Sequence, residues 1–310
     1  MAGNKSNGGK PVVGLALGSG SARGWSHIGV ILELEEIGVR PQVVAGTSIG
    51  ALVGAVYVSG QLQAFAEWVQ KLTVRDVVGL LDFTISGGFV KGEKLFGFFQ
   101  EQHSSPNIEE LSQRYVSVAT DMKTGREVWI TRGPILPAAR ASCALPGMFS
   151  PVIFKDRWML DGGLVNPVPI SAARALGAEV VIAVNLNAQL VGAHLSRASR
   201  QEAETEEDEK EEKEGKEEGR RDRGFWHKLM GYFEGDSEHP ALLDVVSASI
   251  NIMQDRITRS RMAGDPADIT LVPLLEDYAL MDFHRAGEAI AEGRRLVRSH
   301  EEDIRAWAGV

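Results

Sequence analysis

The sequence predicts an α/β fold whose central sheet is mainly parallel and is covered by helices on both faces. Short, very apolar runs recur along the chain, they alternate with segments whose apolar residues fall at helical spacing, and small-residue loops separate the two. Such runs are typical of strands buried on both faces, as in a parallel sheet covered by crossover helices. With 310 residues, 44% of them hydrophobic, the chain is long enough for one large domain or two small ones.

The first unit is a strand, a small-residue loop and a helix. Val12–Leu17 predicts a buried strand, Gly18–Gly24 the loop, and Trp25–Ile37 a helix. This arrangement points backbone N–H groups and a helix N-terminus at an anion. Two kinds of site therefore compete for the loop, a dinucleotide pyrophosphate site and an oxyanion hole.

Two positions argue against a dinucleotide. The Rossmann fingerprint G-x-G-x-x-G requires its third glycine where Arg23 stands, and an acidic residue about 20 positions further on, at the end of the second strand. That strand, Val43–Ala45, carries no acid and leads into Gly46-Thr47-Ser48-Ile49-Gly50 instead. The sequence therefore favours an oxyanion hole and predicts no cofactor.

The second unit centres on Ser48. Its G-x-S-x-G pattern, with Gly46 and Gly50, lies between the second strand and a helix expected at Ala51–Val58. This arrangement is typical of a nucleophile elbow, a tight turn that needs small flanking residues and exposes the serine hydroxyl above the sheet edge. Ser48 is the candidate nucleophile.

The alternation continues to the C-terminus. The region from Gly60 to about residue 113 is mostly helical in pattern. Later strands are expected at Tyr115–Thr120, Arg126–Thr131, Asp156–Leu160, Glu179–Asn185 and Asp268–Val272. Later helices are expected at Pro134–Ala144, Val168–Leu176, Ala241–Ala263 and from the N-cap Asp282 through Trp307.

Asp161 directly follows one of these strands and precedes Gly162 and Gly163. An acid before two glycines at a strand end marks a sharp turn from which the carboxylate projects out of the sheet. Acyl transfer from an ester needs a nucleophile, a base and donors aimed at the oxygen that becomes negative. Ser48, Asp161 and the Gly18–Gly24 loop supply one each, all at strand ends, where doubly wound sheets place their sites.

A Ser-His-Asp triad is the alternative, since α/β-hydrolases carry a histidine after the serine. His27 precedes the serine, and the histidines that follow Asp161 lie in or beside a charged segment or on the last helix. The later candidates are His194, His227, His239, His284 and His300. These are poor places to hold a catalytic imidazole.

Composition limits the class of protein. A single cysteine, Cys143, excludes an intramolecular disulfide framework and a Cys-rich zinc site, and it is compatible with a reducing compartment. We expect Cys143 to be a small buried side chain, and we predict no metal site. Residues 1–10 predict a disordered leader rather than a signal peptide, so the expected location is the cytoplasm.

The net charge of −9 is concentrated in one segment. Residues 202–218 hold eleven acidic residues and three lysines, so the rest of the chain is close to neutral. No basic stripe with interleaved aromatic residues is present, which argues against nucleic acid as a partner. We expect an acidic low-complexity insertion at 196–240, between an α/β core at 11–195 and a C-terminal part of the same domain at 241–310.

Within this insertion, Phe225–Phe233 has the pattern of a short amphipathic helix with basic neighbours. It predicts a peripheral contact with the inner face of a membrane, or a cover over a hydrophobic cleft. Packing of this segment on the protein's own surface is the alternative.

Taken together, the motifs resemble the patatin-like phospholipase family, and within it the small bacterial RssA-type members. The resemblance rests on Gly20–Gly24, on the Ser48 elbow and on Asp161-Gly162-Gly163, and it extends to residues 141–146 and 261–266. It implies a three-layer α/β/α fold and a Ser48–Asp161 dyad without a histidine. It also implies an oxyanion hole formed by N–H groups of the loop, at Gly20, Ser21, Arg23 and Gly24.

The implied function is a serine acyl hydrolase that cleaves lipid carboxylic esters, such as phospholipids or lysophospholipids, through an acyl-enzyme. An ordinary Asp has a pKa of ~3.9 and is a weak base for a hydroxyl, so the dyad needs a short hydrogen bond and a desolvated carboxylate. Ser19 and Ser21 stand where many members have glycine, and the Ser21 hydroxyl is a candidate additional donor. A thioesterase or acyltransferase on the same dyad, and a non-catalytic regulatory protein that binds a lipid or a partner, are the alternatives.

Overall fold

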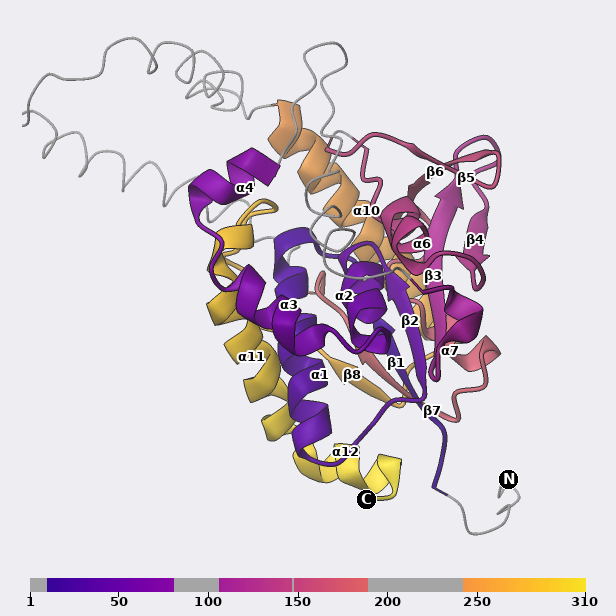
Figure 1. The fold of residues 1–310 in the computed structure, drawn as a ribbon, viewed down its shortest axis with the longest axis vertical. Helices are drawn as coiled ribbons and strands as arrows, with labels where there is room; N and C mark the ends of the chain where they lie inside the picture. Colours follow the sequence, from indigo (N-terminus) through magenta and orange to yellow (C-terminus); the bar gives the residue numbers. More distant parts are fainter. Residues whose placement is uncertain (1–9, 81–105, 147, 189–241) are drawn as a thin grey trace, which may run out of the picture.

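A mainly parallel sheet forms the centre of the computed structural model, which describes residues 10–80, 106–146, 148–188 and 242–310 (Figure 1). The eight-stranded sheet has the order β5-β6-β3-β2-β1-β7-β8, with β4 also paired to β3. The strands are β1 (Val13–Leu17), β2 (Val43–Thr47), β3 (Arg114–Asp121), β4 (Glu127–Ile130), β5 (Val152–Phe154), β6 (Arg157–Asp161), β7 (Val180–Val184) and β8 (Ile269–Leu271). The strands from β3 through β2, β1 and β7 to β8 are parallel, while β4, β5 and β6 are antiparallel additions.

Helices cover both faces of this sheet. The α-helices are α1 (Ser26–Glu36), α2 (Ile49–Val58), α3 (Leu62–Val69), α4 (Val74–Leu80), α6 (Ile135–Ser142), α7 (Ile170–Ala175), α10 (Leu242–Gly264), α11 (Ala286–Ser299) and α12 (Glu301–Ala308). Short 3-10 segments lie at η1 (Ser21–Trp25), η2 (Ile108–Glu110), η3 (Gly162–Leu164) and η5 (Phe283–Arg285).

Alternate residues of the strands enter two separate cores. In β1, Leu15 and Leu17 pack with α1, α2, α6 and α11 in the larger core, whereas Ala16 packs with α7 in the smaller one. This alternation follows from the two-residue period of a strand. The predicted α/β fold with a mainly parallel sheet covered on both faces is confirmed.

The strand β3 brings two other strand ends together. Its first part pairs with β2, with Thr47 opposite Val118, and its last part pairs with β6, with Asp161 opposite Ala119. Because β4 pairs with β3 across both of these parts, β2 and β6 must share the other edge of β3. The end of β2 therefore meets the end of β6, at neighbouring positions of the same strand.

Some elements differ from their predictions. The strand β5 was not expected, because three residues are too short to show a two-residue period, and it is recognised only by its pairing with β6. The predicted C-terminal helix is divided at His300, whose φ of −119° departs from helical geometry. The Asp282 carboxylate does not cap that helix but accepts a hydrogen bond from the Ala279 N–H at 2.8 Å.

Other predictions fall outside the described residues. These include residues 1–9 of the leader and all of the insertion at 196–240, with its segment Phe225–Phe233. The division of the chain into these parts stays a prediction. Among the residues described, β8 joins the central sheet and α11 packs against α1, so the segment after the insertion contributes to both the sheet and its cover.

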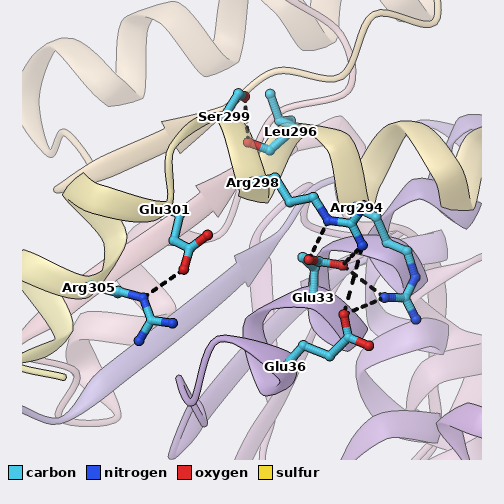
Figure 2. Close-up of polar contacts among 8 residues, drawn as sticks. All are labelled: Glu33, Glu36, Arg294, Leu296, Arg298, Ser299, Glu301 and Arg305. Atoms are coloured by element: carbon cyan, nitrogen blue, oxygen red, sulfur yellow. Dashed lines mark hydrogen bonds and ion pairs between the residues drawn. The ribbon is translucent and has the colours of Figure 1, made fainter.

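Ion pairs connect α11 to α1 (Figure 2). The buried carboxylate of Glu33 accepts hydrogen bonds from Arg298 at 2.6 and 2.9 Å and from Arg294 at 2.8 Å. Glu36, one turn later and exposed, contacts Arg294 at 3.1 Å. The Arg298 hydrogen bonds, followed by Arg294, outweigh the effect of burial and lower the pKa of Glu33.

We predict that Glu33→Ala lowers the free energy of unfolding by about 2 kcal/mol, because it removes the buried partner of two arginines that can themselves return to water. The matched variant Glu36→Ala should cost about 0.5 kcal/mol, since its pair is exposed. Thermal unfolding measures both changes. Because the pKa of Glu33 is lowered on folding, its contribution is present at neutral pH and is lost in acid, as the pH falls through that lowered pKa. Equal losses of unfolding free energy in the two variants would contradict the conclusion that the buried Glu33 contributes more stability than the exposed Glu36.

Candidate active site

The turn between β2 and α2 holds Ser48 in an unusual backbone conformation. Its φ of 57° and ψ of −126° lie in a region that non-glycine residues rarely adopt, at a cost of roughly 1–3 kcal/mol. Two hydrogen bonds fix the turn: the Ser48 N–H donates to Ser142 Oγ at 2.8 Å, and the Ser48 carbonyl accepts from Ala51 N–H at 2.9 Å. The turn places the hydroxyl just beyond the C-terminal end of β2.

The motif glycines share one property, which is that a Cβ atom would collide with a neighbouring element. The atoms it would meet are Ala51 Cα at Gly46, Leu17 O at Gly50, Val118 O at Gly162 and Gln254 Nε2 at Gly163. At Gly24 it would meet the Ile49 side chain. Glycine thus lets the loop after β1 lie directly against the start of α2, next to Ser48.

Asp161 lies where β6 ends, and its carboxylate faces Ser48. The Ser48 hydroxyl donates to Asp161 Oδ2 at 2.5 Å, and the Gly163 N–H donates to Oδ1 at 2.7 Å. The side chain is fully buried. Burial outweighs both hydrogen bonds and raises the pKa of Asp161 to about 7. This carboxyl group can therefore exchange a proton with a hydroxyl near neutral pH.

The loop after β1 uses some of its amides for structure. The N–H groups of Gly18, Ser19 and Ala22 donate to the carbonyls of Val184, Pro167 and Leu280, at 3.1, 2.8 and 3.3 Å. Within the part of the chain that the structure describes, no hydrogen bond takes the amides of Gly20 and Ser21, which begin the first turn of η1. These two N–H groups are the ones that remain for an anion.

The Ser21 hydroxyl does not serve as the additional donor that we considered. It donates to the Leu280 carbonyl at 2.6 Å and so attaches the loop to the chain before η5. Ser21 itself has a φ of 52°, a left-handed conformation that favours glycine. The hydroxyl therefore positions the loop.

Arg23 and Ser19 extend from the loop into a buried polar cluster. Arg23 Nη2 donates to Asn187 Oδ1 at 3.4 Å, and Gln254 Oε1 accepts from Ser19 Oγ at 2.9 Å and from Asn187 Nδ2 at 2.8 Å. Asn187 follows β7 and Gln254 lies on α10. The cluster joins the loop to two segments that no sequence motif had indicated.

Ser142, at the end of α6, is another residue to which the sequence motifs assigned no role. Its hydroxyl accepts from the Ser48 N–H and donates to the Val118 carbonyl of β3, and the residue is fully buried. The Val118 carbonyl also lies against Gly162. Ser142 therefore connects the turn of the candidate nucleophile with the strand that holds the candidate base.

The histidines lie elsewhere in the described structure. His27 is buried, its Nε2 is 2.8 Å from the Gly18 carbonyl, and burial lowers its pKa to about 4, so the ring is neutral at neutral pH. His300 contacts the Leu296 carbonyl, and His284 lies in η5. Among the described residues, no histidine is hydrogen-bonded to Ser48 or Asp161. His194, His227 and His239 fall outside the described ranges.

Neither the cysteine nor a metal site adds a reactive group among the described residues. Cys143 is buried as expected, and burial raises the pKa of its thiol. Within the described ranges, no group of three or more His, Cys, Asp or Glu side chains is arranged to hold a metal ion. None of the helices in those ranges is long and apolar enough to cross a membrane.

Comparison with known proteins places this geometry in a family. The sequence pattern of the patatin-like phospholipases matches residues 15–174, a span that contains both Ser48 and Asp161. An NTE family protein of Mycobacterium bovis is 33% identical over 324 residues, which cover 92% of this chain and 90% of that protein. The chain belongs to the patatin-like phospholipase family. The predicted three-layer α/β/α fold and enzyme class, a carboxylic ester hydrolase of the phospholipase type, are thereby confirmed.

Two longer proteins are also similar to this chain. Patatin-like phospholipase domain-containing protein 6 of Homo sapiens is 36% identical over 185 residues, which are 57% of this chain and 13% of that protein. Lysophospholipase NTE1 of Scheffersomyces stipitis is 28% identical over 290 residues, which are 89% of this chain and 17% of that protein. The similarity therefore concerns a small part of each of these two proteins.

We predict that Ser142→Ala lowers kcat by about tenfold with little change in KM, because a loosened Ser48 turn raises the barrier by ~1.4 kcal/mol without altering binding. Ser117→Ala is the matched control. Its buried hydroxyl also joins β3 to α6, by donating to the Ala138 carbonyl at 2.9 Å, whereas the hydroxyl of Ser142 is the one that holds the Ser48 N–H. Both variants should lose about 1 kcal/mol of stability. Equal kcat in the two variants would show that Ser142 has only a structural role.

Proposed function

We propose that this patatin-like protein hydrolyses carboxylic esters of lipids, with Ser48 as nucleophile and Asp161 as the base. The observation that carries the proposal is the 2.5 Å hydrogen bond from the Ser48 hydroxyl to the buried Asp161 carboxylate. Family membership supports a lipid ester as substrate, and the name of the Scheffersomyces stipitis relative, a lysophospholipase, supports a lysophospholipid in particular.

In the first step the Ser48 oxygen attacks the acyl carbonyl while its proton passes to Asp161 Oδ2. A C–O bond forms and the carbonyl oxygen becomes an oxyanion. We assign the amides of Gly20 and Ser21 as the hydrogen-bond donors to this oxyanion. The neighbouring amides of Gly18, Ser19 and Ala22 are already hydrogen-bonded within the fold. The family resemblance also suggested the amides of Arg23 and Gly24, but these lie inside the 3-10 segment η1, where amides bond to carbonyls three residues earlier, so the proposal does not use them.

The tetrahedral intermediate then collapses. The ester C–O bond breaks, the alcohol takes the proton from Asp161, and the acyl group stays on Ser48. In the second half-reaction Asp161 accepts a proton from water as the water attacks the acyl-enzyme, and the proton returns to Ser48 as the fatty acid is released. The carboxyl group therefore serves as base and acid in turn, a role that requires a pKa near the working pH.

The buried environment of Asp161 supports this role. With the ordinary value of 3.8 the carboxylate would be a poor proton acceptor, whereas burial raises the pKa to about 7. The Gly163 N–H holds the other carboxylate oxygen, so that Oδ2 is directed at Ser48. Neither contact requires a histidine, which is consistent with a two-residue dyad.

An acyltransferase or thioesterase would share the same acyl-enzyme and would differ only in the acceptor or in the ester. Product analysis with an oxygen ester and with a thioester, each in water alone and with an added alcohol acceptor, separates these activities from hydrolysis of oxygen esters. A non-catalytic protein with the same fold would not form the acyl-enzyme at all.

We predict that Ser48→Ala lowers hydrolysis of a short-chain p-nitrophenyl ester by about 10³-fold or more, and that Asp161→Asn has a similar effect. The asparagine can still accept from Gly163 N–H, but its amide nitrogen cannot take the serine proton. A fluorophosphonate probe should label the wild type and not the Ser48→Ala variant. His284→Ala is the control and should keep full activity. If the probe failed to label the wild type, the protein would have the patatin-like fold without the proposed catalytic activity.

The pH dependence provides a separate prediction. Since the ionised carboxylate is the base, kcat/KM should rise about tenfold per pH unit below about pH 7 and level off above it, following the pKa of Asp161. Stability should change in the opposite direction. A carboxyl group whose pKa is raised on folding destabilises the folded state as the pH increases from about 4 to above 7. The Tm of Asp161→Asn relative to wild type should increase over that range, and a constant difference would contradict the raised pKa.

A further inference from the structure

Three exposed apolar side chains lie next to one another on the antiparallel end of the sheet. Ile153 of β5 is paired directly with Trp158 of β6, and the Met122 N–H donates to the Trp158 carbonyl at 2.9 Å. Their exposed fractions are 58%, 53% and 53%. Directly opposite residues of antiparallel strands project from the same face, so the three side chains form one surface, here called the hairpin patch.

The hairpin patch lies at the same end of the sheet as the dyad, although Trp158 and Asp161 project from opposite faces of β6. β3 continues beyond the end of β2, from Val118 opposite Thr47 to Asp121, and Met122 follows it. Trp158 precedes Asp161 by three residues on β6, or roughly 10 Å along the strand. In Figure 1 the β5–β6 hairpin lies at one end of the molecule and α12 at the other. A surface in contact with the patch would therefore lie beyond the end of the sheet at which Ser48 is found.

The surroundings of the patch are basic. Four exposed cationic residues lie in the two turns that carry it, namely Lys123, Arg126, Lys155 and Arg157, against one exposed acid, Asp156. Asp121 is buried; its carboxylate accepts from the N–H groups of Lys123 and Thr124 and pairs with Arg157 at 3.5 Å. The local positive charge contrasts with the net charge of −9 of the whole chain.

We infer that the hairpin patch docks the protein on an anionic lipid surface, an interaction that deepens the proposed function by presenting the site to its lipid ester substrates. Indole rings favour the boundary between water and hydrocarbon, and lysine and arginine are attracted to anionic headgroups. A second copy of this chain fits less well, because two identical patches would bring their basic residues together.

Sedimentation of the full-length protein with vesicles tests this inference. Vesicles of phosphatidylcholine containing phosphatidylglycerol should bind the wild type more strongly than vesicles of phosphatidylcholine alone. Trp158→Ser should weaken that binding about tenfold, and Lys155→Glu about fivefold or more. Trp307→Ser is the matched control. Trp307 is 49% exposed, but it lies on α12 at the far end of the molecule, and its loss should leave binding unchanged.

Activity measurements separate this inference from the proposed function. Trp158→Ser should keep the wild-type kcat/KM on a soluble short-chain ester but lose hydrolysis of a lysophospholipid held in anionic vesicles. If the wild type hydrolysed neither ester, the proposed function would fail. The sedimentation experiment would still test whether the hairpin patch binds anionic vesicles. Equal binding by wild type, Trp158→Ser and Trp307→Ser would overturn the inference. One other result would also overturn it: the wild type forms a dimer, Trp158→Ser dissociates that dimer, and vesicle binding persists in the variant. The patch would then be the contact with a second copy of the chain.

Discussion

The pairing of two strands along one edge of β3 is the constraint on which the candidate site depends. β2 ends opposite Val118 and β6 ends opposite Ala119, so Ser48 and Asp161 leave the sheet at adjacent points although 113 residues separate them. The backbone hydrogen bonds of β3 fix this distance more rigidly than any loop could. A shift of one residue in either register would move one side chain to the opposite face of the sheet and break the dyad.

Several features of the candidate site lower the stability of the folded state. Ser48 and Ser21 adopt positive φ values, and Asp161 is a buried carboxyl group without a cationic partner among the contacts described. The surrounding structure holds these conformations in place: Ser142 fixes the elbow, the buried cluster around Gln254 fixes the loop, and the contact of α11 with α1 secures the helical layer behind them. Strain at a reacting group and support from its neighbours are the usual division of roles in an active site.

The hairpin patch lies on the antiparallel strands, which extend beyond the parallel part of the sheet. A purely parallel sheet would end level with Ser48, whereas β3, β5 and β6 extend beyond it. The extension supplies Asp161 at its base and Met122, Ile153 and Trp158 further out. A family that acts on lipid esters has to meet substrates that are held in aggregates, and one structural extension here carries both the candidate base and the surface proposed to meet them.

The sequence by itself determined the fold class, the Ser48 elbow and the Asp161 turn, because strand periodicity and tight turns depend on residues that are close along the chain. It also indicated the loop at Gly20–Gly24, but not which of its amides remain available. The tertiary structure alone decided the contacts between distant segments. These are the hydrogen bond of the dyad, the burial that raises the pKa of Asp161, the role of Ser142, and the bond of the Ser21 hydroxyl to Leu280, 259 residues away. Burial and strand register arise from segments far apart in the sequence, so no local pattern records them.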